Sequence, residues 1–118
     1  MKLFLINPSR DSNKKGDFWD FKFEKRILGQ TALMPLFLPT IAAATPEDFE
    51  IQIIDEKIET INFDDKVDVV GIGAMTSTIN RAYEISDEYR KRGVKVAIGG
   101  IHASMMYEEA AQHADSVL

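Results

Sequence analysis

Cysteine is absent from the 118 residues of this sequence. A disulfide framework, a thiolate nucleophile and a cysteine-ligated cluster are therefore excluded for these residues. Positive charge is also scarce, since 14 Lys and Arg stand against 19 Asp and Glu and the formal net charge is −5. Because nucleic acids and anionic membranes are bound through clustered Lys and Arg, we expect neither as a partner.

Long apolar runs are missing as well. No stretch approaches the about 20 residues that a transmembrane helix needs, and the opening MKLFLIN is too short for a signal peptide. A cytoplasmic location is the resulting expectation. Hydrophobic residues still make up 45% of the chain, which is enough for the core of one small domain.

The clearest pattern is a strand, a helix and a second strand. Residues 68–74 and 94–98 are short and rich in Val and Ile, as is typical of strands buried on both faces. Residues 79–92 between them predict a helix, which Gly93 ends. One face of that helix carries apolar or small side chains at helical spacing: Ile79, Ala82, Tyr83, Ile85 and Ser86.

Polar residues and glycines follow both strands. Ligands of open parallel sheets bind beyond the carboxyl ends of the strands, and those ends carry Thr76-Ser77-Thr78 and Gly99-Gly100. The hydroxyls can cap the helix that follows. Paired glycines let backbone approach a ligand, although a tight turn explains them equally well. We expect the pair to matter more for a ligand than for the fold. His102 follows them, but a lone His is more often a surface residue than a ligand.

The remaining elements complete an α/β pattern. We expect a strand over residues 2–6, a helix over 34–45, a strand over 49–55, a helix over 105–113 and a strand over 115–118. Pro35 or Pro39 would be tolerated in the first turn of the first helix. Ile58, Ile61 and Phe63 are expected to anchor the polar connection over 56–66. The predicted fold is a Rossmann-like, flavodoxin-like three-layer sandwich, with about five parallel strands in the order 2-1-3-4-5. The single domain covers residues 1–118. Because its last strand has only begun, we expect the chain to be a fragment of a longer protein.

Several alternative sites are less consistent with the sequence. Gly71-Ile72-Gly73 lies inside a strand, so we interpret these glycines as small residues under a closely packed helix and not as a dinucleotide fingerprint. A Walker A sequence is absent. Asn7 and Met75 stand where a phosphorylation receiver needs acids. Asp64, Asp65 and Asp68 are interpreted as a solvated turn and not as a metal site.

Residues 10–30 are long and polar for a connection within a compact domain. Four aromatic residues, Phe18, Trp19, Phe21 and Phe23, stand among the charges without a clean period. Two alternatives remain open: a mobile insertion, or a flap that packs its aromatic rings on a ligand or on another domain.

Several stretches together match one family. INPS, MPLFLPTIAAATPEDFEIQIIDE, VDVVGIGAMTSTINRAYEISDEYRKRG and VAIGGIHASMMYEEAAQHADSV resemble the N-terminal cobalamin (B12)-binding domain of B12-dependent radical SAM enzymes. The resemblance covers nearly the whole chain and is most specific at GGIHAS followed by EEAAQHADSV. Tyr107 departs from it, because many relatives have Pro before the paired Glu.

This resemblance implies cobalamin as the cofactor. Other B12 proteins replace the lower cobalt ligand with the His of a DxHxxG motif after the first strand. That motif is missing after Asn7, so the resemblance implies binding without a protein lower ligand and with the nucleotide tail beside the sheet. Carried over by position, the residues near the tail are Thr76, Ser77, Thr78, Gly99 and Gly100. Those at the corrin edge are Asn7, Pro8, Ser9, Ile101, His102 and Ala103.

The resemblance also implies a function for a parent protein. The parent would be a methyltransferase, or an oxidative cyclase like the anaerobic magnesium-protoporphyrin monomethyl ester cyclase. S-adenosylmethionine and a [4Fe–4S] cluster would be bound only by a C-terminal radical SAM domain, the partner of these residues, which are not themselves expected to be catalytic. The alternative is a degenerate structural or substrate-recognition module that binds no corrinoid. A nucleotide- or flavin-binding protein is disfavoured by the missing phosphate loop.

Overall fold

A computed structural model of the chain describes residues 1–9 and 36–118. Five strands form one sheet in the order β2-β1-β3-β4-β5, and every neighbouring pair is parallel. The strands are β1 Lys2–Asn7, β2 Glu50–Asp55, β3 Val69–Gly73, β4 Lys95–Gly99 and β5 Ser116–Val117. The predicted fold class and strand order are confirmed. The segment 10–30 and the start of the first predicted helix, with Pro35, lie outside the described residues.

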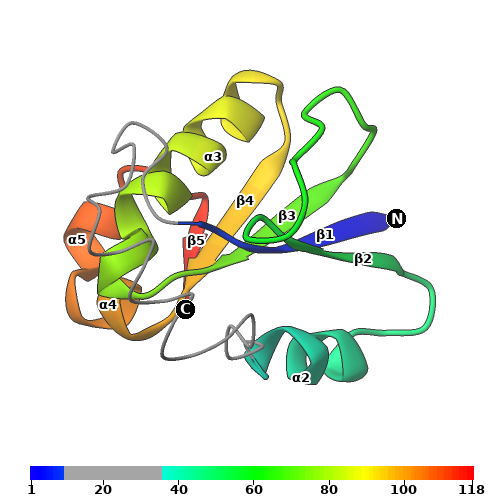
Figure 1. Cartoon of the computed structure of the whole chain (residues 1–118), viewed down its shortest axis with the longest axis horizontal. Coiled ribbons are helices and arrows are strands. Elements are labelled where there is room, and N and C mark those ends of the chain that lie inside the picture. The colour runs from blue at the N-terminus through cyan, green and yellow to red at the C-terminus, as the bar shows by residue number, and fades with distance from the viewer. Residues whose placement is uncertain (10–35) are drawn as a thin grey trace.

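Helices cover both faces of the sheet (Figure 1). The helix α2, Phe37–Ala44, lies on one face, with Pro39 in its first turn. The helices α3 Ile79–Lys91, α4 Ile101–Met105 and α5 Tyr107–Ala110 lie on the other. A chain that alternates strand and helix buries both faces of a parallel sheet in this way, so the predicted three layers are present.

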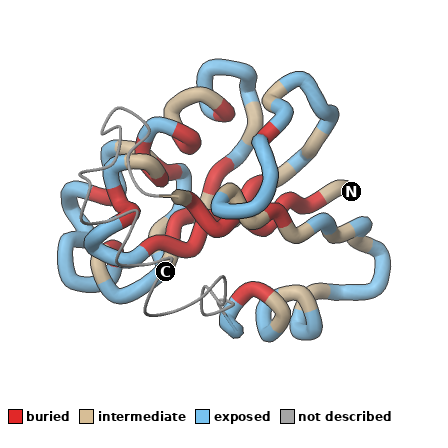
Figure 2. Tube along the Cα trace, viewed as in Figure 1, coloured by how far each residue is buried: buried red, intermediate tan, exposed pale blue. Residues whose placement is uncertain are grey.

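The core has two parts of unequal size. The larger lies on the α3 side of the sheet, and the smaller joins Leu38 of α2 to Leu3 and Leu5 of β1. Figure 2 shows the buried residues following the central strands. The largest fully buried side chains of the α3 side include Tyr89, Phe4, Ile6, Ile85 and Ile98. The α2 helix buries only Leu38, so it is held far more lightly than α3.

The helix α3 follows its predicted pattern closely. Its buried residues are Ile79, Ala82, Tyr83, Ile85, Ser86 and Tyr89. Gly93 has a φ of 81°, and its N–H donates to the carbonyl of Arg90 at 3.0 Å while the N–H of Val94 donates to that of Tyr89 at 3.1 Å. These two bonds form a Schellman motif, for which the left-handed conformation of glycine is suited.

Two local expectations are wrong. The helix expected over 105–113 is reduced to α5, Tyr107–Ala110, while α4 forms earlier, over Ile101–Met105, and Met106, at φ −114° and ψ 49°, separates the two. Ile58 does not anchor its connection, since it lies in a turn with its N–H bonded to the Asp55 carbonyl and is 82% exposed. Ile61 is buried and Phe63 packs against the core, as expected.

None of the described helices combines the length and apolar character that crossing a bilayer requires.

Candidate functional site

The carboxyl ends of β1, β3 and β4 lie at one edge of the sheet, because the three strands are parallel neighbours. The loops after β3 and β4 are bonded to each other there. The N–H of Ala74 donates to the carbonyl of Gly99 at 3.0 Å, and Nδ1 of His102 lies 3.2 Å from Oγ1 of Thr76. The structure therefore brings two of the predicted groups together at the edge where parallel sheets bind ligands.

The third predicted group, after β1, is bonded to the end of β2. Asn7 donates from Nδ2 to Asp55 Oδ1 at 3.0 Å. Ser9 donates from its N–H and its hydroxyl to Glu56 Oε1, at 3.0 and 2.6 Å. Pro8 between them is fully buried. This loop is thus fixed beside the edge by Asp55, which ends β2, and by Glu56, which follows it.

An arginine from α3 completes this arrangement. Arg81 donates from Nη2 to Glu56 Oε2 at 2.7 Å and from Nε to Oε1 at 2.9 Å. Burial raises the pKa of Glu56, but the hydrogen bonds from Arg81 and Ser9 outweigh it and leave that pKa below its usual range. The hydrogen bond to Glu56 in turn raises the pKa of Arg81. Glu56 is therefore a carboxylate at neutral pH, and its charge is balanced locally.

The paired glycines have different roles. Gly100 has a φ of 119°, and a Cβ there would lie 2.2 Å from the carbonyl oxygen of Ala74. Gly99 has no such φ, and its Cβ would meet Leu118 Cβ at 3.5 Å, an ordinary contact. The expectation that both glycines matter more for a ligand than for the fold is wrong for Gly100, which the turn after β4 requires. At position 99, in contrast, the fold does not require glycine.

Small residues line the sheet on the side of α2. Gly71 is in register with Ala97 and Gly73 with Gly99, and residues in register on parallel strands face the same way. A Cβ at Gly73 would lie 1.8 Å from Cε2 of Phe37 in α2. This confirms the interpretation of Gly73 as a small residue under a helix. We call Gly71, Gly73, Ala97 and Gly99 the sheet floor.

The hydroxyl residues form a turn that precedes α3. Thr76–Thr78 is a 3₁₀ helix in which Thr78 is buried, whereas Thr76 and Ser77 are exposed. Thr78 Oγ1 accepts a bond from the N–H of Met75 at 3.1 Å, and it makes no capping bond to α3. The expectation that these hydroxyls cap α3 is therefore wrong, because the Thr78 hydroxyl bonds to the backbone of Met75, which precedes it, and not to the first turn of α3.

The last predicted residues differ in exposure. Ile101 is 71% exposed, while Ala103 is fully buried in the core of the α3 side. The imidazole of His102 is largely enclosed, with 16% of its side chain exposed. It lies between Thr76 and Glu109, whose Oε1 is 3.2 Å from Nε2.

Two residues of this arrangement were not identified from the sequence. Glu109 Oε1 also accepts a bond from the hydroxyl of Tyr83 at 2.8 Å. The bonds from Tyr83 and then from His102 lower the pKa of Glu109, and burial, followed by the bond to Glu109, raises the pKa of Tyr83. The sequence placed Tyr83 only on the apolar face of its helix, and it assigned no role to Glu109. The one sequence signal that could have indicated this contact was the presence of an acidic residue, Glu109, seven positions after His102.

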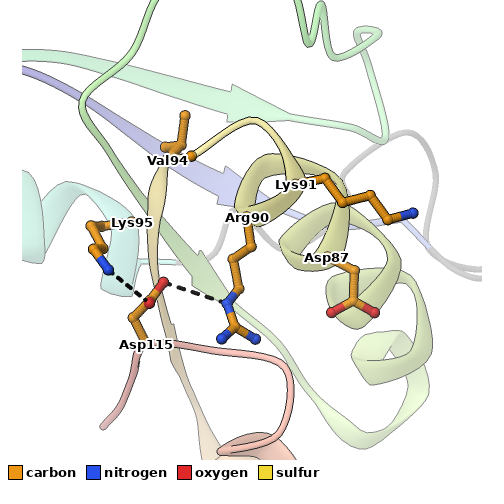
Figure 3. Close-up of a pocket in the computed structure, with 7 residues that line it drawn as sticks. Asp87, Arg90, Lys91, Val94, Lys95 and Asp115 are labelled. Carbon is orange, nitrogen blue, oxygen red and sulfur yellow. Dashed lines mark hydrogen bonds and ion pairs between the residues drawn. The ribbon is translucent and has the colours of Figure 1, made fainter.

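A hollow lies at the opposite edge of the sheet, between the end of α3, the start of β4 and the loop before β5 (Figure 3). Three of its charged residues are paired through Asp115. Asp115 lies 3.2 Å from Nζ of Lys95 and 3.6 Å from Nε of Arg90. A bond from the N–H of Val96, followed by the Lys95 contact, lowers the pKa of Asp115. Asp115 therefore holds β5 and α3 to β4, which is a structural role.

Comparison with known proteins adds a family and three relatives. The family described as "B12 binding domain" matches residues 31–118. The chain is 43% identical over 90 residues to a bacteriochlorophyllide d C-8(2)-methyltransferase of Chlorobaculum tepidum, covering 75% of the chain and 20% of that protein. It is 37% identical over 87 residues to a bacteriochlorophyllide d C-12(1)-methyltransferase of the same organism, covering 72% and 19%.

A more distant relative is an uncharacterized methyltransferase of Pyrococcus horikoshii, 30% identical over 118 residues, with 92% of the chain and 23% of that protein covered. The chain thus spans about a fifth of the length of these curated relatives. No solved structure matches it.

Proposed function

This chain belongs to the family of B12-binding domains, and from that premise we propose that it holds cobalamin at the carboxyl edge of its sheet on behalf of a methyltransferase. The observation that carries the placement is the sheet floor. Its four positions have no side chain larger than a methyl group, and two of them, Gly73 and Gly99, stand side by side at the end of β3 and β4.

The sheet floor fits the planar base of the nucleotide tail. The aromatic ring of Phe37 already lies against Gly73, so close to the backbone that a side chain at position 73 would collide with it. A flat ring can therefore rest directly on the backbone of this sheet. Sites of this kind combine apolar walls with a few polar groups, and the exposed hydroxyls of Thr76 and Ser77 stand next to the floor, after β3.

The residues of the site would divide between the two parts of the cofactor. Thr76, Ser77, Thr78, Gly99 and Gly100 would border the tail, and Asn7, Pro8, Ser9, Ile101, His102 and Ala103 would lie toward the corrin edge. When bound, cobalamin supplies a cobalt centre that can carry a methyl group. These residues would bind and orient it without a protein lower ligand, because both ring nitrogens of His102 already have partners.

We propose residues 1–118 as one domain of a longer enzyme, because the match covers only about a fifth of the length of each relative. A C-terminal radical SAM domain, with S-adenosylmethionine and a [4Fe–4S] cluster, would act beside it. Methyl transfer is favoured over oxidative cyclisation, since all three relatives are named methyltransferases. The methyl acceptor would be a bacteriochlorophyllide or a similar tetrapyrrole.

The experiment is a titration of the chain with hydroxocobalamin, followed by its visible spectrum, together with the variant Gly99→Val. Because a Cβ at Gly99 has room, this variant should keep its circular dichroism and a cooperative melt. It should bind hydroxocobalamin at least about tenfold more weakly, since a branched side chain would stand on the sheet floor. Ala111→Val, at an exposed position beyond α5, is the matched control and should bind like the parent chain.

Equal binding by Gly99→Val and the parent chain would show that the tail lies elsewhere. A spectrum of histidine ligation that disappears in His102→Ala would contradict binding without a protein lower ligand.

One observation favours a second function, that of a module that binds no corrinoid. Phe37 occupies the space over Gly73, so its ring must move before a base can rest there. Failure of both the parent chain and Phe37→Ala to bind hydroxocobalamin would support this second function. If only Phe37→Ala binds hydroxocobalamin, then the Phe37 ring blocks the site in the parent chain, and the sheet floor itself is able to hold the base.

A further inference from the structure

We propose that His102 is a positioning residue that clamps the loop after β3 to the loop after β4, and that Glu109 and Tyr83 hold its ring in place. Thr76, His102, Glu109 and Tyr83 are called the edge clamp. The inference rests on the proposed cofactor site, because it assigns to these side chains the task of keeping the edge of that site in shape.

The edge clamp is continuous in its contacts. Nδ1 of His102 is 3.2 Å from Oγ1 of Thr76, and Nε2 is 3.2 Å from Oε1 of Glu109. The same carboxylate oxygen accepts the hydroxyl of Tyr83 at 2.8 Å. Three hydrogen bonds therefore join the turn before α3, the helix α4, the helix α5 and the middle of α3.

The end of the clamp at Tyr83 is rigid. Tyr83 is 8% exposed, and its ring is stacked on that of His113, with centroids 4.1 Å apart and an angle of 12° between the planes. His113 is fixed in turn, since its Nδ1 is 3.1 Å from the carboxylate of Asp87 and its carbonyl accepts the buried hydroxyl of Ser86. Thr76, at the other end, is exposed. The rigid core around Tyr83 therefore holds the exposed loop at Thr76 in place through the hydrogen bonds of the clamp.

The contacts also determine where the neutral imidazole carries its hydrogen. Glu109 has a lowered pKa and is ionised at neutral pH, so its oxygen can only accept. Nε2 of His102 must therefore be the donor, and Nδ1 accepts the hydrogen of the Thr76 hydroxyl. The clamp thus fixes the direction of the Thr76 hydroxyl as well as its place, and leaves the lone pairs of Oγ1 available to a donor on a ligand.

The test compares Glu109→Ala with the conservative Glu109→Gln, which keeps an acceptor oxygen. The matched control is Glu108→Ala, because Glu108 is an exposed neighbour that makes no hydrogen bond or ion pair within the described part of the chain. Two quantities are measured: the tautomer of His102, from its imidazole ¹⁵N shifts, and the dissociation constant for hydroxocobalamin.

In the parent chain we expect the Nε2–H tautomer to dominate. Glu109→Ala should reduce its share, increase amide exchange over Thr76–Thr78 and raise the dissociation constant about tenfold, the effect of losing one hydrogen bond to a charged group. Glu109→Gln should restore most of the affinity, and Glu108→Ala should change nothing. Tyr83→Phe, which removes only the hydroxyl at the rigid end, should act in the same direction as Glu109→Ala.

The Nδ1–H tautomer in the parent chain, or parent-like exchange and affinity in both Glu109→Ala and Tyr83→Phe, would overturn the clamp. The tautomer and the amide exchange are measured without cofactor. If the parent chain does not bind hydroxocobalamin, the proposed function fails, while a response of both quantities to Glu109→Ala would still support the clamp.

Discussion

Two tyrosines of α3 have hydroxyls in opposite situations. The hydroxyl of Tyr83 donates to Glu109. The hydroxyl of Tyr89 is buried and has no hydrogen-bond partner among the described residues, although its ring packs against Phe63 with centroids 5.0 Å apart. Burial, with the nearby charge of Asp65, raises the pKa of Tyr89 to about 12. An unpaired buried hydroxyl loses its hydration without compensation, so Tyr89 is a weak point of an otherwise well-paired core.

The variant Tyr89→Phe should therefore be as stable as the parent chain, or more stable by up to about 1 kcal/mol, because it removes a polar group that the fold leaves unpaired. Urea unfolding measures the difference. Tyr83→Phe is the matched control and should lose about 0.5–1.5 kcal/mol, the net value of an ordinary hydrogen bond. A clear loss of stability in Tyr89→Phe would mean that its hydroxyl has a partner after all.

At the scale of elements, two ends depend on a glycine with positive φ. Gly93 ends α3 at φ 81°, and a Cβ there would meet nothing within 4 Å. Gly100 follows β4 at φ 119°, and a Cβ there would collide with the backbone of Ala74. The first position demands glycine only for its conformation, whereas the second demands it for conformation and for space.

Gly93→Ala should accordingly cost about 1–2 kcal/mol, the strain of a left-handed residue. Gly100→Ala should cost about 2–5 kcal/mol, because overpacking against backbone is added to that strain. Both values come from urea unfolding of the chain, and each variant serves as the control for the other. Equal losses would contradict the clash with Ala74.

The elements that the sequence predicted well have strong local signals. The runs of Val and Ile at β3 and β4 and the spaced apolar residues of α3 need no tertiary information to be recognised. The break at Met106 was not predictable in this way, because methionine is a good helix former and nothing in its local sequence ends a helix there. Ile58 was misplaced for a related reason, since an apolar residue in a short turn can face solvent.

The site was predictable only in part. The position of His102 near Thr76 followed from the topology, because both residues come directly after neighbouring strands. Its second partner did not, since Glu109 reaches it across the irregular link between two short helices. The bond between Ser9 and Glu56 spans 47 positions and has no sequence signature at all.

At the scale of the whole molecule, Glu56 and Arg81 join three regions. Their side chains are only 10% and 19% exposed, and Glu56 also accepts both bonds from Ser9. The ends of β1 and β2 and the first turns of α3 are thereby held by one carboxylate. The lowered pKa of Glu56 makes this bond a source of pH-dependent stability.

The sign follows from the direction of the shift. A carboxyl whose pKa is lower in the folded chain adds stability above its ordinary pKa of 4.5, and this contribution is lost as pH falls through the folded pKa. Glu56→Gln should therefore lose about 1.5–3 kcal/mol at pH 7, and less below pH about 4. Urea unfolding at both pH values measures this.

Glu84→Gln is the control, because Glu84 bonds the same guanidinium at 2.9 Å but is 41% exposed. It should lose less than about 0.5 kcal/mol. A Glu56→Gln loss that does not change with pH would contradict the role of its charge.

The strand order also has a consequence for synthesis. The central strand β1 pairs with residues 48 positions later in β2 and 66 positions later in β3. At about 5–20 residues per second, a ribosome needs roughly 3–13 s to make the second partner. During that interval the Leu-Phe-Leu-Ile run of β1 remains unpaired and apolar, and such segments aggregate or recruit chaperones. The long-range pairing of the central strand thus delays the formation of this sheet until β3 has been made.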